Sequence, residues 1–111
     1  MAKREDTVKR IVKKYIELIA DSNIKVEKVY LFGSHAKGTA GEHSDIDIAI
    51  VSKDFSGDRF ADRRLVVPLR RKIDRRLEPI PYRPENFREN DPLVVEILRT
   101  GIQIEADGAL S

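Results

Sequence analysis

The segment from Asp45 to Val51 constrains the fold of this chain more than any other stretch. It alternates strictly, with one set at Asp45, Asp47 and Ala49 and the other at Ile46, Ile48 and Ile50. Because successive side chains of a β-strand point to opposite faces, the alternation predicts a strand with one apolar face in the core. Both aspartates then share the other face, about 7 Å apart at Cα.

Two carboxylates on one strand face are a costly arrangement, because like charges repel and aspartate is poorly suited to strand interiors. Their oxygens can converge on hard cations such as magnesium. A pair of such ions stabilises both the attacking and the leaving oxygen of a phosphoryl displacement. The alternative interpretation is a solvent-facing acidic pair on an ordinary amphipathic strand.

A Gly33-Ser34 pair ends the preceding predicted strand, residues 25–32. Glycine lets the backbone approach a phosphate closely, and Ser34 is suited to cap the next short helix and to meet a phosphate oxygen. A Gly-Ser pair alone is an ordinary turn. Followed about eleven residues later by Asp-Ile-Asp, it favours a nucleotide site.

The other elements follow from hydrophobic periodicity and end signals. We expect a helix over residues 5–20 with Tyr15 in the core, and a helix over 58–77 that Pro68 kinks or splits. Residues 77–82 read as a strand whose two prolines limit its pairing or place it at a sheet edge. A helix over 92–100, begun by Asp91-Pro92 and ended by Gly101, precedes a strand over 102–105. This order predicts an α/β or α+β domain on a small sheet.

Length and composition narrow the class of protein. With 111 residues we expect one domain over 1–111, too small for a separate substrate domain, so a partner chain or a second copy would complete the substrate site. The chain has no cysteine, no apolar run that could cross a bilayer and no secretory signal, so we expect a cytoplasmic protein. Basic residues crowd 63–76. Such a run is able to contact nucleic acid, the phosphates of a nucleotide or an acidic partner. We favour a solvated helix face and do not expect direct nucleic-acid binding.

The stretch GSHAKGTAGEHSDIDIAI resembles the signature of the minimal nucleotidyltransferases, a branch of the DNA polymerase beta-like superfamily. The resemblance covers the size and element order of the whole chain, and implies a small mixed sheet flanked by helices. It also implies that Gly33 and Ser34 bind a triphosphate and that Asp45 and Asp47 bind two magnesium ions.

The same family places a third carboxylate, a metal ligand or base, on a later strand. The matching residue is Glu78, although many relatives have aspartate there, and Asp74 is its rival. Lys37 is a candidate for neutralising phosphate charge, with a plain exposed lysine as the alternative. We interpret His35 and His43 as loop residues, because magnesium seldom takes imidazole.

The resemblance implies transfer of AMP from ATP to a hydroxyl. Stand-alone domains of this family are commonly antitoxins, so the expected acceptor is a tyrosine of a partner HEPN-type toxin. Two alternatives remain open from the sequence. One is a non-catalytic partner-binding antitoxin with a vestigial nucleotide site, and the other is a nucleotidyltransferase for small molecules such as aminoglycosides. Each of these three functions is compatible with a homo-oligomer.

Overall fold

A computed structural model describes residues 4–105 and contains one four-stranded sheet. Its strands are β1 (Lys28–Phe32), β2 (Ile46–Val51), β3 (Leu77–Tyr82) and β4 (Ile102–Ile104). They lie in the order β3-β2-β1-β4. Strand β1 is antiparallel to β2 and β4, whereas β2 and β3 are parallel, so the sheet is mixed as the resemblance implies.

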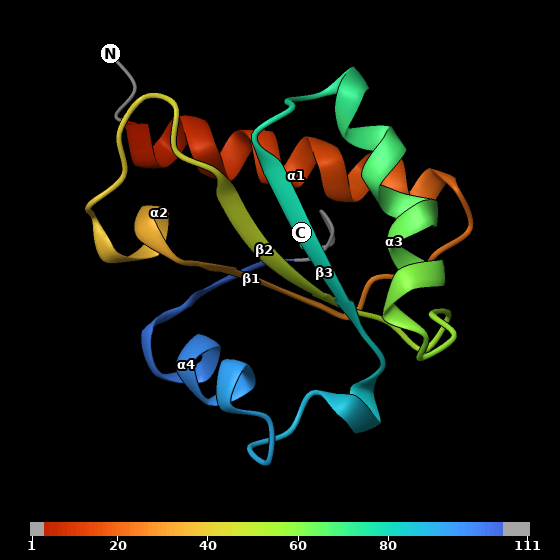
Figure 1. Ribbon diagram of the computed structural model, residues 1–111. Helices are drawn as coiled ribbons and strands as arrows, with labels where there is room; N and C mark the ends of the chain where they lie inside the picture. Colours follow the sequence, from red (N-terminus) through yellow and green to blue (C-terminus); the bar gives the residue numbers. More distant parts are fainter. Residues whose placement is uncertain (1–3, 106–111) are drawn as a thin grey trace.

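The helical segments are α1 (Arg4–Asp21), α2 (Ser34–Lys37), α3 (Arg59–Val66), η1 (Val67–Lys72), η2 (Pro84–Asn86) and α4 (Pro92–Thr100). Figure 1 shows α1 and α4 on opposite sides of the sheet, with α3 beside β3. Within residues 4–105, no helix is both long and apolar enough to cross a membrane.

The two faces of β2 pack against different helices. Ile46, Ile48 and Ile50 lie in the main core with the apolar stripe of α1, as the alternation predicts. Ala49 and Val51 belong to the second core cluster, which includes Val94 and Ile97 of α4. Because alternate residues of a strand share a face, Asp47 lies on the α4 side of the sheet.

Several predicted boundaries needed correction. The strand expected over 25–32 begins at Lys28. The helix expected over 58–77 is shorter: α3 ends at Val66, and a 3-10 helix with Pro68 in its first turn continues only to Lys72. Proline lacks the N–H and clashes with the preceding turn, so it splits the helix as expected. Asp74 therefore lies in the turn before β3 and not on a helix.

Strand β3 contains two prolines yet pairs with β2 along all six of its residues, so the expected limit on its pairing was wrong. The carbonyls of Arg76 and Tyr82 accept hydrogen bonds from the β2 side, whereas those of Leu77 and Pro79 point to the outer edge and accept from arginine side chains. The N–H and C=O of one strand residue point to the same side of the strand. Pro79 and Pro81 therefore face the outer edge, where the missing N–H removes no hydrogen bond to β2. The expected edge position is confirmed.

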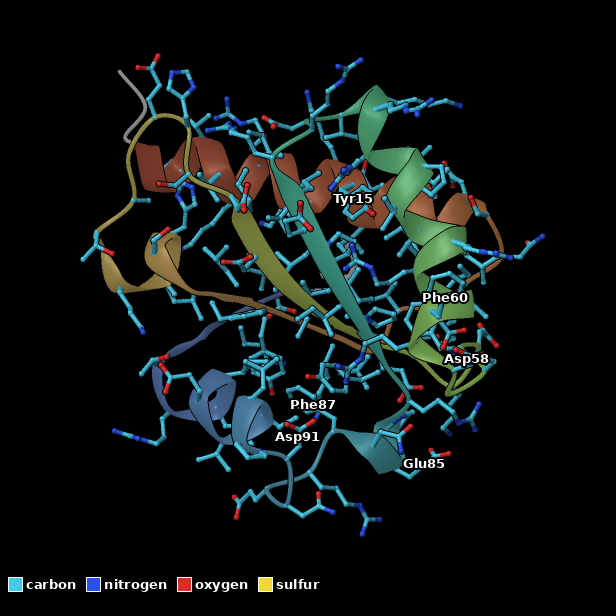
Figure 2. All side chains as sticks on the ribbon, viewed as in Figure 1. Tyr15, Asp58, Phe60, Glu85, Phe87 and Asp91 are labelled. Carbon is cyan, nitrogen blue, oxygen red and sulfur yellow. The ribbon has the colours of Figure 1, made fainter. Side chains whose placement is uncertain are left out.

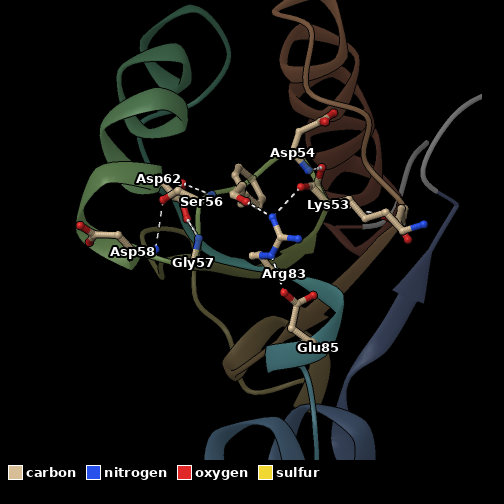
Figure 3. A network of polar contacts seen from close by, with 11 residues as sticks. Lys53, Asp54, Ser56, Gly57, Asp58, Asp62, Arg83 and Glu85 are labelled. Atoms are coloured by element: carbon tan, nitrogen blue, oxygen red, sulfur yellow. Dashed lines mark hydrogen bonds and ion pairs between the residues drawn. The ribbon is translucent and has the colours of Figure 1, made fainter.

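A network of hydrogen bonds fixes the connection between β2 and α3 (Figure 3). Asp62, only 2% exposed, accepts from the backbone N–H groups of Ser56 (2.8 Å) and Gly57 (3.1 Å) and from the Ser56 hydroxyl (2.9 Å). The Asp58 carboxylate caps α3, and Arg83 donates to two carbonyls of the connection. The start of α3 is thereby held firmly against the sheet.

Tyr15 joins α1 to the end of α3. Its ring, labelled in Figure 2, is fully buried as expected. Its hydroxyl donates to the carbonyl of Val66. Burial raises the pKa of this hydroxyl well above its usual range. At the other end of the chain, the Asp91 side chain accepts from the N–H of Leu93 and Gly101 follows the last residue of α4, so both end signals are confirmed.

Candidate active site

Asp45 and Asp47 occupy the start of β2. Asp45 immediately precedes the strand and is exposed, while Asp47 is its second residue and is half-buried. Burial, followed by the negative charges of Asp45 and Glu78, raises the pKa of Asp47, and His35 opposes the shift. Asp47 is therefore close enough to interact with both Asp45 and Glu78, although Glu78 lies far from it along the chain.

Gly33 lies directly against Asp47. A Cβ atom on Gly33 would stand 2.4 Å from the Oδ2 of Asp47, far inside van der Waals contact. Gly33 has φ 74° and ψ −151°, a conformation that is essentially restricted to glycine. The turn after β1 therefore requires glycine for both its backbone conformation and the approach of the aspartate.

Ser34 is the first residue of α2 and not its cap. Gly33 occupies the N-cap position and no side chain caps this helix, so the predicted capping role of Ser34 was wrong. The reason is geometric, since a cap precedes the first helical residue and its side chain must reach back to the N–H groups of the first turn. Ser34 remains next to the close contact between Gly33 and Asp47.

Glu78 lies directly opposite Asp47 in the parallel pairing of β2 and β3. Its Oε2 is 3.0 Å from Nη1 of Arg70, and its Oε1 is 3.7 Å from Nη2 of Arg63. Asp74 instead makes an ion pair with Arg76 at 2.8 Å, and this hydrogen-bonded contact lowers the pKa of Asp74. Of the two rival carboxylates, Glu78 is the one that faces Asp47.

Of the remaining predicted residues, His35 and Lys37 lie on α2 itself, so the interpretation of His35 as a loop residue was wrong. The ammonium of Lys37 is 3.1 Å from a carboxylate oxygen of Glu96 on α4, so it has a partner within the chain, and this contact lowers the pKa of Glu96. The Nε2 of His35 lies 3.3 Å from the Ser44 carbonyl, and His43 is exposed.

The donor set suits magnesium in part. In residues 4–105, no three histidine, aspartate or glutamate side chains are grouped so that they could hold a metal ion together. Magnesium commonly takes only one or two protein carboxylates and completes its shell with water and substrate phosphates. The adjacent carboxylates of Asp45 and Asp47 fit that requirement.

A cavity of about 570 Å³ lies elsewhere, at the far end of β3. Arg59, Tyr82 and Asp91 are among its lining residues. The cavity is not lined by Asp45, Asp47 or Glu78. We therefore identify the candidate active site from the carboxylates of Asp45, Asp47 and Glu78 and not from the size of a cavity.

Sequence reasoning missed the two arginines that contact Glu78. Arg63 and Arg70 belong to the basic run that was interpreted as a solvated helix face, yet both are only partly exposed. No local pattern identifies their partner, because the contacts span 15 and 8 positions and depend on how α3 and η1 pack beside β3.

Similar proteins were found by sequence and by structure. A segment of 41 residues is 46% identical to the protein adenylyltransferase MntA of Shewanella oneidensis, covering 37% of this chain and 30% of that protein. A toxin–antitoxin crystal structure with AMP-PNP superposes with a TM-score of 0.58 at 27% identity, covering 82% of this chain and 70% of that chain.

A crystal structure of a protein from Sulfolobus solfataricus has the same fold. It matches with a TM-score of 0.63 at 24% identity, covering 93% of this chain and 87% of that one. The family model described as a nucleotidyltransferase domain matches residues 8–103, from the first turns of α1 to β4. Because that match spans nearly all of the described structure, this protein belongs to the nucleotidyltransferase domain family.

Proposed function

We propose that this chain transfers AMP from ATP to a tyrosine hydroxyl of a HEPN-type partner toxin and acts in the cytoplasm as its antitoxin. The relative from Shewanella oneidensis is a protein adenylyltransferase, and a structural relative is a toxin–antitoxin pair that contains AMP-PNP. The alignment spans only 30% of the curated relative. The AMP donor, the acceptor tyrosine and the HEPN-type partner are therefore what the family resemblance implies, whereas nucleotidyl transfer is also supported by the geometry of the site.

One observation carries the proposal: Asp45, Asp47 and Glu78 gather beside the glycine turn that follows β1. Asp45 and Asp47 would hold two magnesium ions, and Glu78 would act as the third carboxylate, either as a ligand or as the base for the acceptor hydroxyl. Bound ions would supply positive charge for the triphosphate and for the oxygens of an in-line displacement. Such charge complementarity is usually the largest contribution to catalysis of this kind.

The remaining residues would bind the nucleotide. Gly33 leaves room for the chain to come close to a phosphate, and the Ser34 hydroxyl beside it can donate to a phosphate oxygen. Lys37 would neutralise phosphate charge. Its half-exposed ammonium must first leave Glu96, which costs little because surface ion pairs contribute only about 0–1 kcal/mol.

A labelling experiment tests the proposal. The chain and a HEPN-type protein chosen as the candidate partner are incubated with α-labelled ATP and magnesium, and label on the partner is measured. We expect transfer by the natural chain and by Asp21→Asn, a control at an exposed carboxylate at the end of α1. We expect none from the double variant Asp45→Asn, Asp47→Asn. Label that survives the double variant would refute the assigned site.

The binding-only alternative has one observation in its favour, namely that arginines already engage Glu78. A chain that forms a stable complex with the partner but transfers no label, and shows no magnesium-dependent affinity for ATP, would be a binding subunit. The same assay therefore separates the two functions.

A further inference from the structure

Two arginines hold the Glu78 carboxylate from one side of β3. Nη1 of Arg70 donates to Oε2 of Glu78 at 3.0 Å and to the carbonyl of Leu77 at 2.9 Å. Nη1 of Arg63 donates to the carbonyl of Pro79 at 2.7 Å, and its Nη2 lies 3.7 Å from Oε1 of Glu78. This arginine pair, Arg63 and Arg70, therefore contacts the backbone on both sides of Glu78 as well as its side chain.

The arginine pair comes from a firmly held segment. Val66, between the two arginines, is fully buried, and its carbonyl accepts from the hydroxyl of Tyr15. The start of the same segment is fixed by the hydrogen bonds of Asp62. Because the outward carbonyls of an edge strand have no strand partner, the guanidinium groups find acceptors there at fixed positions. The segment that carries Arg63 and Arg70 is therefore fixed in place, and so are the two guanidinium groups that contact Glu78.

The arginine pair affects how readily the Glu78 carboxylate can bind a metal ion. Two arginines beside the Glu78 carboxylate fix its position and neutralise part of its negative charge, so it binds a metal ion beside Asp47 less readily than a free carboxylate would. Arginine is suited to this role because its planar fork contacts a carboxylate and a carbonyl together.

We propose that Arg70, assisted by Arg63, is a positioning residue that keeps Glu78 at the outer edge of β3 and limits its access to a divalent ion at Asp45 and Asp47. The inference rests on the proposed function, in which Glu78 is the third carboxylate. Loss of Arg70 then frees Glu78, so the nucleotide-free chain binds the divalent ion more tightly.

Mn²⁺ binding to the nucleotide-free chain, measured by calorimetry, tests the inference without any activity readout. We expect Arg70→Ala to tighten Mn²⁺ binding about fivefold, equivalent to about 1 kcal/mol for a partly exposed ion pair. Arg71→Ala is the matched control, because it removes the same charge from an exposed neighbour in the same segment. It should leave the affinity nearly unchanged.

A double-mutant cycle separates contact through Glu78 from general electrostatics. In a Glu78→Gln background, Arg70→Ala should no longer tighten Mn²⁺ binding. Arg70→Lys keeps the charge but loses the fork, so its affinity should lie between those of the natural chain and Arg70→Ala. It also serves as the test variant if Arg70→Ala does not fold.

Two results would overturn the inference while leaving the proposed function intact. In the first, Arg70→Ala and Arg70→Lys match Arg71→Ala. In the second, the tighter binding persists undiminished in the Glu78→Gln background. A natural chain that binds no Mn²⁺ and transfers no label would instead refute the proposed function, and the inference with it.

Discussion

Replacing Gly33 with alanine tests whether the turn after β1 exists to admit the Asp47 carboxylate. The added Cβ would stand 2.4 Å from Oδ2 of Asp47, whereas ordinary contact begins at about 3.4 Å. One of the two groups must therefore move by about 1 Å. Because misplacing a reacting group by about 1 Å can lower a rate about 100-fold, we expect label transfer to fall by about that factor.

The same substitution should also destabilise the fold. A non-glycine residue at φ 74° and ψ −151° costs about 1–3 kcal/mol. The unfolding entropy of about 2.1 cal/mol/K per residue gives a change in Tm of about 4 °C per kcal/mol for a chain of this length. Thermal unfolding of Gly33→Ala should therefore occur about 4–12 °C lower.

Gly38→Ala is the matched control. Gly38 also has a positive φ, at 79°, but a Cβ there would meet no atom within 4 Å. It should lower Tm by a similar or smaller amount, because the left-handed conformation costs about 1–2 kcal/mol, yet preserve transfer. If the two alanine variants transfer label equally well, contact between Gly33 and Asp47 does not control the site.

Three further predictions follow from the polar contacts. Asp47→Asn should raise Tm at neutral pH without metal, because it removes a half-buried charge beside other carboxylates. If Asp47 binds magnesium, added magnesium should raise the Tm of the natural chain but not that of Asp47→Asn. The pKa of Asp74 is lowered from 3.8 by its hydrogen bond with Arg76, so this pair stabilises the fold above pH 3.8 and the stabilisation is lost as pH falls through the lowered pKa. Urea unfolding should show Asp74→Asn to be less stable at neutral pH, and the difference should vanish in strong acid. Asp62→Ala should cost about 3 kcal/mol in urea unfolding, more than Asp62→Asn, since it leaves three hydrogen-bond donors without their acceptor.

Local patterns predicted those parts of the site that neighbouring residues determine. The alternation of β2 correctly placed its isoleucines in the core, and therefore the face on which Asp47 lies. The same reasoning could not choose between Glu78 and Asp74, because they are four positions apart and only the pairing of β3 with β2 decides which one faces Asp47. Periodicity indicates which face a residue occupies but not what it meets across the fold.

Tertiary contacts account for the remaining differences. Lys37 has the exposure expected of a surface lysine, yet its partner Glu96 comes from α4 at the other end of the chain. Likewise, the basic run was interpreted as a solvated face, because nothing near Arg63 or Arg70 in the sequence shows that β3 lies beside them. The sequence predicted that Pro68 would break the helix expected over 58–77, but not that helical structure would end at Lys72. Pro68 indicated a break, but the 3-10 geometry after it depends on packing against α1 and β3.

The two prolines of β3, which argued against an ordinary strand, help to explain why Glu78 lies on the same face of the sheet as Asp47. A slip of one residue in the pairing with β2 would turn Glu78 toward the α1 core, because a strand has a period of two. The same slip would turn Pro79 and Pro81 toward β2, where each would leave a β2 carbonyl without its N–H partner. In the observed register both prolines point outward, and the carbonyl of Pro79 accepts from Arg63. The prolines therefore disfavour any register shift by an odd number of residues. They keep Glu78 on the same face of the sheet as Asp47.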